Sequence, residues 1–257
     1  NVATLVRRPK GSRREKPTLT QDEARALLDA LAEHRMSALV TCGVSLGLRL
    51  GEVLGLQWAD IDLRQGSLTV RRALQTVGRV RQLADLKSKQ SNRTIALPAV
   101  VVKTLERHKV AQAERRLAAG PTWEVTDFVF TTRTGRPLDG TLTTRDLKRI
   151  AAKVWVGGST ECQHTRLRDR DCLDCGGRRL PAIGFQGLRH SCTSLLLAAG
   201  VPVRDVSELL GHSDIRLTLT NYAHVLDASR TRMAGLIDRV FTAEIDGRTD
   251  SQTYGHR

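Results

Sequence analysis

The stretch from residue 185 to residue 224 constrains this 257-residue chain more than any other. Two apolar helical segments follow each other there, and each is expected to stop at a glycine, Gly200 or Gly211, because glycine suits the left-handed conformation that ends many helices. Arg189 should open the first helix, and the second should span Val203–Leu210. The helix ends are therefore predicted to gather four polar side chains on one rim: Arg189, His190, His212 and Tyr222.

A guanidinium, an imidazole and a phenol on one rim suit a phosphate better than a carbonyl group. Arginine offers a planar fork that matches phosphate oxygens and stays charged at any working pH. Tyrosine can attack phosphorus once a neighbour takes or stabilises its proton. The rim therefore favours phosphoryl-transfer chemistry.

The order and spacing of the R-H, L-G-H-S and Y motifs resemble those of tyrosine recombinases, and the chain is similar to the catalytic domain of a phage-type integrase. Two further motifs of that family are present, GLRLGE around Arg49 and LKSKQSNRTIAL around Lys87. The resemblance covers roughly residues 18–240. It agrees with the fold class expected here, an α+β, mainly α domain with a small three-stranded antiparallel sheet.

The resemblance implies site-specific DNA strand exchange. Tyr222 would attack a backbone phosphate and form a 3′-phosphotyrosyl link while the 5′-hydroxyl leaves. Arg49 and Arg189 would neutralise the charge on the phosphate oxygens, His212 would donate to one of them, and Lys87 would protonate the leaving oxygen. Because the link conserves bond energy, we expect no catalytic cofactor, neither ATP nor a metal.

Three neighbours of these residues complete the candidate catalytic set. Glu52 is expected to hold part of the arginine or histidine constellation, or else to be a plain charge at a helix N-terminus. His190 belongs to the R-H motif. Gln186 stands where the family usually has a histidine that manages the tyrosine proton, and a glutamine can only hydrogen-bond a phosphate oxygen or the phenol. We therefore expect activity that is reduced rather than absent.

Composition points to a polyanionic partner. Forty-one lysines and arginines against 27 acidic residues leave a formal charge of +14, which favours double-stranded DNA over mere solubility once the motifs are considered. No apolar run reaches membrane-spanning length, and no signal peptide is visible. We expect no membrane partner, and a protein of the bacterial cytoplasm associated with the nucleoid.

The catalytic domain is expected at residues 18–241, with a polar tail at 242–257. Residues 1–17 are predicted to be a basic interdomain linker or a solvated tail, and the start at Asn1 without methionine predicts a fragment that lacks the family's DNA-clamping domain. The apolar stripe of residues 233–241 should pack within the chain or dock onto a neighbouring subunit, as in a homo-tetramer on DNA.

Periodicity predicts the main elements. Thr20 and Glu23 form a capping box before one helix, and residues 38–48 should form a central apolar helix. Further helices are expected at 98–119 and 143–156, and strands at 67–74, 76–83, 92–97 and 128–132. Lys87 and Lys89 share the last turn of this sheet, where either is also compatible with a solvated role; the match to the family motif favours Lys87.

Residues 157–181 interrupt the recombinase pattern and have no periodicity. The segment has three thiols and an imidazole, a Cys3His set for a structural zinc, with the tight C-x2-C spacing between its last two cysteines: Cys162, His164, Cys172 and Cys175. A flexible loop with incidental cysteines is the alternative. Cys42 and Cys192 lie in apolar helices and are expected to be buried thiols.

Two other functions remain open. A type IB topoisomerase uses the same chemistry but rejoins the same strand, whereas the LGHS motif favours an integrase. A recombinase-derived DNA-binding regulator without catalysis is weakly favoured by Gln186. It is disfavoured by four intact residues: Arg49, Lys87, Arg189 and Tyr222.

Overall fold

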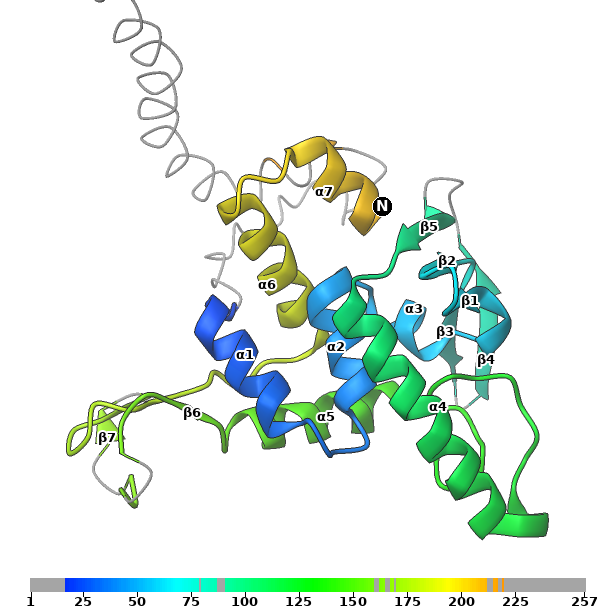
Figure 1. The fold of residues 1–257 in the computed structure, drawn as a ribbon, viewed down its shortest axis with the longest axis horizontal. Coiled ribbons are helices and arrows are strands. Elements are labelled where there is room, and N and C mark those ends of the chain that lie inside the picture. Colours follow the sequence, from blue (N-terminus) through cyan, green and yellow to red (C-terminus); the bar gives the residue numbers. More distant parts are fainter. Residues whose placement is uncertain are drawn as a thin grey trace, which may run out of the picture.

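The structure is a computed structural model that describes residues 17–78, 80–86, 91–159, 162–164, 167–168, 170–211, 215–216 and 219. Helices pack at its centre and three small antiparallel sheets lie around them, so the predicted α+β, mainly α class is confirmed (Figure 1). Among the described residues, every helix is too short or too polar to cross a membrane.

Two N-terminal helices form as predicted. Helix α1 (Gln21–Ala30) begins with the capping box: the Glu23 amide donates to Thr20 Oγ1 at 3.2 Å, and the Thr20 amide donates to Glu23 Oε2 at 3.0 Å. Helix α2 (Ser37–Leu46) is buried nearly all round and contacts α1, α3, α4 and α6, because its residues are apolar on every face. It is the central helix of the fold.

The predicted strands form two sheets rather than one. Strands β1 (Ile61–Asp62), β2 (Ser67–Val70) and β5 (Arg93–Ala96) make an antiparallel three-stranded sheet, while β3 (Arg72–Val77) and β4 (Val80–Asp85) pair as a separate ribbon. The single strand expected at 67–74 was therefore wrong, since it breaks at Arg71 and passes from one sheet to the other. The strand expected at 76–83 was wrong as well, because it spans the turn between β3 and β4. Alternation continues across the break, so periodicity alone could not locate it.

The short helix α3 (Leu50–Leu54) lies against the ribbon. A β-carbon added to Gly51 would come within 2.9 Å of the Leu74 carbonyl oxygen, so only glycine permits this approach of α3 to β3. The GLRLGE motif therefore fixes the position of a helix as well as that of an arginine.

Helix α4 (Ala99–Ala119) begins after Pro98, as predicted, and buries His108. Short 3₁₀ turns occur at Trp58–Asp60 and Gly120–Thr122. The strand expected at 128–132 was wrong: it is reduced to isolated bridges at Phe128 and Thr131. Helix α5 (Gly140–Ala151) starts after the Asp139 cap, and the prediction of a helix up to residue 156 was wrong.

Helix α6 (Phe185–Ala198) starts one turn earlier than predicted, which places Arg189 inside the helix rather than at its start. Helix α7 (Val203–Leu210) has the predicted bounds and ends at Gly211 in the left-handed conformation. Gly211 closes this helix just before His212, which lies outside the described residues.

The insertion contains regular structure that its sequence did not reveal. Strands β6 (Trp155–Val156), β7 (Leu167–Arg168), β8 (Asp171–Cys172) and β9 (Arg178–Arg179) form a sheet in the order β6-β9-β8-β7. Strands of two residues leave no period to detect. Figure 1 shows this sheet as an arm that projects from the helices, on the side away from β3 and β4. We call residues 155–179 the arm.

Candidate active site

Arg189 is held at the ends of two helices. Its guanidinium is almost buried, with 8% of the residue exposed; Nη1 donates to the Gly47 carbonyl at 2.6 Å and Nη2 to the Leu210 carbonyl at 2.8 Å. Gly47 caps α2 and Leu210 ends α7, so both carbonyls lie at negative helix ends, where a cation is stabilised. One side chain thereby fastens α6 to α2 and α7.

Arg49 lies just after the end of α2. Two residues beyond Gly47, it is the N-cap of α3; its amide donates to Glu52 Oε2 at 3.0 Å and its Nη1 to Glu52 Oε1 at 2.7 Å. Its side chain is 45% exposed, whereas that of Glu52 is 1% exposed. A buried carboxylate thus orients a guanidinium that still faces solvent.

Arg93 is a member of this site that sequence reasoning missed. From β5, its Nη2 donates to Glu52 Oε2 at 3.0 Å and its Nε to the Leu209 carbonyl at 2.6 Å, and its side chain is 8% exposed. The signal was present, because Arg93 shares the inward face of the strand with Ile95. An arginine on the apolar face of a strand requires a buried partner.

Glu52 is ionised by its neighbours. Burial raises the pKa of its carboxyl, but the charge and hydrogen bond of Arg93, with the bonds from Arg49, outweigh burial and hold the pKa below its ordinary value. We call Arg49, Glu52, Arg93 and Arg189 the arginine network. It joins α3, β5 and α6 to the last carbonyls of α7.

Three predicted catalytic residues, Lys87, His212 and Tyr222, lie outside the described residues, as does Lys89. Along the chain, Lys87 falls between β4 and β5, and His212 directly follows Gly211. The described part therefore brings together the Arg49 and Arg189 motifs and the end of the helix that precedes His212.

The four cysteine and histidine residues of the arm form a second polar cluster. Their ligand atoms all lie within 4.8 Å of one another. Cys162 Sγ is 3.6 Å from Cys172 Sγ, and Cys175 Sγ is 3.4 Å from His164 Nδ1. The Gly177 amide donates to Cys175 Sγ and lowers the pKa of this thiol to about 6.

The sequence matches the phage integrase family over residues 17–229. The chain belongs to this family of tyrosine recombinases. A XerC-like tyrosine recombinase of Caldanaerobacter subterraneus subsp. tengcongensis is 30% identical to it over 237 residues, which cover 87% of this chain and 54% of the relative. An integrase of Streptomyces ambofaciens is 31% identical over 246 residues, which cover 94% of this chain and 58% of the relative. This integrase-family chain thus spans little more than half the length of these relatives.

Solved structures show the same integrase-family fold. The Tn1549 transposon integrase, solved in complex with transposon right end DNA, gives a TM-score of 0.67 at 19% identity and covers 92% of this chain and 70% of its own. The XerA recombinase gives a TM-score of 0.61 at 20% identity, and the match covers 88% of this chain and 67% of the XerA chain.

Gln186, which was expected to stand in place of a histidine, lies on α6 and is exposed. It lies three residues before Arg189 and four before the half-buried His190, so the three side chains share one side of the helix. Cys192, on the same helix, is buried, and burial raises the pKa of its thiol to about 12. Cys42 behaves in the same way, so both are the unreactive buried thiols that the sequence predicted.

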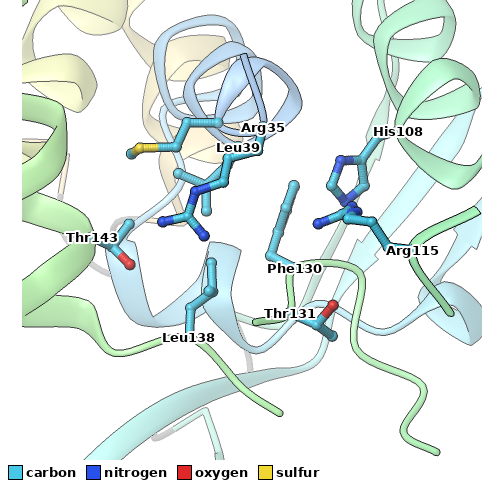
Figure 2. Close-up of a pocket in the computed structure, with 9 residues that line it drawn as sticks. Arg35, Leu39, His108, Arg115, Phe130, Thr131, Leu138 and Thr143 are labelled. Atoms are coloured by element: carbon cyan, nitrogen blue, oxygen red, sulfur yellow. The ribbon is translucent and has the colours of Figure 1, made fainter. Parts of the chain in front are cut away.

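A pocket elsewhere in this integrase-family domain is too small for a substrate. It measures about 20 Å³, and Figure 2 shows Phe130 in its wall between Arg35 and His108. A volume of this size holds roughly one water molecule. It shares no lining residue with the arginine network, so the candidate site consists of charged groups at helix ends and not of this pocket.

Proposed function

We propose that this chain is the catalytic part of a site-specific DNA recombinase that cleaves and rejoins DNA through a 3′-phosphotyrosyl intermediate. One observation supports this most. Arg189 binds the carbonyl of Gly47, two residues before Arg49, and that of Leu210, two residues before His212. A single guanidinium thus links three of the segments that carry the family motifs.

In the proposed reaction, the phenolic oxygen of Tyr222 attacks phosphorus, and the bond from phosphorus to the 5′-oxygen breaks. The leaving oxygen takes a proton from Lys87, and the phenol loses its own proton to a neighbouring group or water. A 5′-hydroxyl of a partner duplex then attacks the phosphotyrosine, which releases Tyr222 and reseals the backbone. The number of phosphodiester bonds is conserved, so the reaction needs no ATP.

In this proposal, the arginines and His212 stabilise the negative charge that develops on the phosphate. Arg49 and Arg189 would face the non-bridging oxygens, where charge accumulates, and His212 would donate to one of them. Glu52 and Arg93 are positioning residues in this proposal. The buried carboxylate holds Arg49 toward solvent, and Arg93 holds both this carboxylate and the end of α7.

The proposed partner is double-stranded DNA. The formal charge of +14 supports a polyanionic ligand, and the Tn1549 integrase of similar fold was solved with transposon DNA. We further propose a homo-tetramer on DNA, joined through residues 233–241, which lie outside the described residues. Integration or excision of a mobile element in the bacterial cytoplasm, at the nucleoid, is the corresponding biological role.

Trapping of a covalent adduct tests the proposal. A nicked duplex that carries the DNA flanking the gene loses a short 5′ fragment after cleavage, so that rejoining fails and the phosphotyrosine accumulates. We expect an adduct with the wild-type protein and none with Tyr222→Phe, which should keep its DNA affinity. The matched control, Tyr254→Phe in the polar tail, should form the adduct normally.

The remaining outcomes identify the alternatives. An adduct that persists in Tyr222→Phe would place the nucleophile elsewhere. Relaxation of supercoiled plasmid without strand exchange would indicate a type IB topoisomerase. Tight DNA binding by a wild-type protein that never forms an adduct would favour the regulator, the alternative that Gln186 supports.

A further inference from the structure

We propose that the arm binds one structural Zn²⁺ through Cys162, His164, Cys172 and Cys175. With zinc bonds of about 2.3 Å to sulfur and about 2.0 Å to nitrogen, a tetrahedral site has about 3.8 Å between two sulfurs and about 3.5 Å between a sulfur and a nitrogen. The separations of 3.6 Å between Cys162 Sγ and Cys172 Sγ and 3.4 Å between Cys175 Sγ and His164 Nδ1 are close to these values. All four ligand atoms lie within 4.8 Å of one another, so small movements complete the tetrahedron.

The backbone forms a tight knuckle around two of the sulfurs. The Gly176 amide donates to the Cys172 carbonyl at 2.9 Å, and the Cys172 amide donates to the Gly177 carbonyl at 2.7 Å. Gly158 closes the other side: a β-carbon there would come within 2.7 Å of Cys175 Sγ, and its φ of +76° is itself left-handed. The chain is thus folded closely around Cys175.

Hydrogen-bond donors and one aromatic ring surround the ligands. The His164 amide donates to Cys162 Sγ and the Gly177 amide to Cys175 Sγ, both at 3.4 Å, and such bonds offset the negative charge of metal-bound thiolates. The Trp155 ring stacks on the His164 ring at a centroid distance of 3.9 Å and an angle of 13°. The ring plane that presents Nδ1 to the sulfurs is therefore fixed.

The arm has too little apolar contact to hold this arrangement without a metal. Of the residues between 157 and 179 whose side chains the structure describes, only Cys172 and Gly177 are buried, and Leu173 is 58% exposed. His164 has a φ of 50° and is the one non-glycine residue of the described chain with a left-handed backbone. A strained residue in a segment without a core indicates that ligand bonds to a metal supply the order.

The arm is also anchored to the domain. Arg170 Nη1 is 3.1 Å from Glu23 Oε1, in the capping box of α1, and β9 pairs with β6 next to the end of α5. Three thiolates and an imidazole favour zinc over the oxygen-preferring Mg²⁺ and Ca²⁺. The metal would therefore fix an arm whose base is tied to α1, on the side of the molecule away from α3 and β5 in Figure 1.

Metal analysis tests the site directly. Protein purified without a histidine tag, under reducing conditions, should contain one zinc per chain. The double variant Cys172→Ser, Cys175→Ser should lose it, whereas His164→Cys, which replaces the imidazole by a fourth thiolate, should retain it. Cys42→Ala removes a cysteine outside the arm and should keep the full zinc content.

A second readout does not depend on any variant folding well. Chelation of the wild-type protein should change tryptophan fluorescence, since Trp155 stacks on a ligand, and added Zn²⁺ should reverse the change. Trp155→Phe should lose this signal while Trp58 and Trp123 remain. Cobalt in place of zinc should give the intense d–d absorption of a tetrahedral thiolate site.

Three outcomes would overturn the proposal. The first is a folded wild-type protein that contains no zinc and whose fluorescence does not change with chelator or added zinc. The second is a disulfide between Cys162 and Cys172 under the same reducing conditions. The third is full zinc content in the double serine variant. None of these measurements involves DNA cleavage, so the test of the zinc site does not depend on the proposed recombinase activity.

Discussion

The arginine network and the arm both bring several polar groups into close contact, but from different distances along the chain. Arg189 and Gly47 are 142 residues apart, and Arg93 and Leu209 are 116 apart. In the arm, Cys162 and Cys172 are 10 residues apart, and His164 and Cys175 are 11 apart. The network is held by the packed core around it, whereas few of the arm's described residues are buried. We therefore expect the network to fail only when the domain unfolds, and the arm to fail alone.

Replacement of Arg189 by lysine should give the largest effect. A point charge cannot bind the Gly47 and Leu210 carbonyls together and also present a fork to phosphate, so we expect cleavage to fall by at least about 10²-fold. Single-turnover cleavage of the nicked duplex measures it. Arg204→Lys, in an exposed pair with Glu208, is the control and should cleave normally. A near-normal rate for Arg189→Lys would mean that only its charge matters.

Glu52→Ala should destabilise the domain by about 3 kcal/mol, because it leaves the buried Arg93 guanidinium without its carboxylate. Urea denaturation measures the change. Glu208→Ala breaks an exposed pair and should change stability by less than about 0.5 kcal/mol. The comparison of the two regions predicts that zinc content stays the same in both variants, and loss of zinc from folded Glu52→Ala protein would show that the regions are coupled.

Gln186→His tests the exposed residue that lies one helical turn before Arg189. A histidine can take the tyrosine proton, so we expect cleavage to rise by up to about 10²-fold and a limb near the histidine pKa to enter the pH profile. The wild-type profile should lack this limb. Gln186→Asn, which keeps the amide and cannot take a proton, is the control. A rate that is unchanged or lower in Gln186→His would mean that another residue or water already serves this role.

Acid should weaken the network through Glu52. The pKa of its carboxyl is lowered in the folded state from an ordinary value of 4.5, so its contribution to stability is present above that value and is lost as the pH falls through the lower, folded value. Denaturation midpoints of the wild type and Glu52→Gln should therefore converge as the pH falls further below 4.5, the ordinary value. A constant difference across this range would show that the pKa of Glu52 is not lowered.

Arg170→Ala should have the smallest effect. It removes the half-exposed pair with Glu23 that ties the arm to α1, so we expect about 1 kcal/mol or less in unfolding free energy. Hydrogen exchange should quicken in the arm and stay the same in α2 and α6. Arg178→Ala, which breaks the exposed pair with Asp171, should leave both regions unchanged. Faster exchange throughout the core would mean that the arm supports the whole domain.

Local patterns determined much of this protein. The capping box of Thr20 and Glu23, helix α7 with its stop at Gly211, the start of α4 after Pro98 and the burial of Cys42 and Cys192 all follow from the residues themselves. These features depend on contacts within a few turns of the chain or on the apolar character of one helix. The family motifs around Arg49 and Arg189 were visible for the same reason, since each is a short run of residues.

Only the tertiary structure decided which segments meet. The strand expected at 67–74 divides at Arg71 because its first half pairs with β1 and β5 and its second half pairs with β4. Arg93 joins the site because β5 brings it within hydrogen-bonding distance of Glu52 and the end of α7. The arm's strands of two residues are too short to leave a pattern. A sequence records the periods and caps that local backbone geometry imposes, whereas long-range pairing depends on the burial and hydrogen bonding of groups that periodicity does not distinguish.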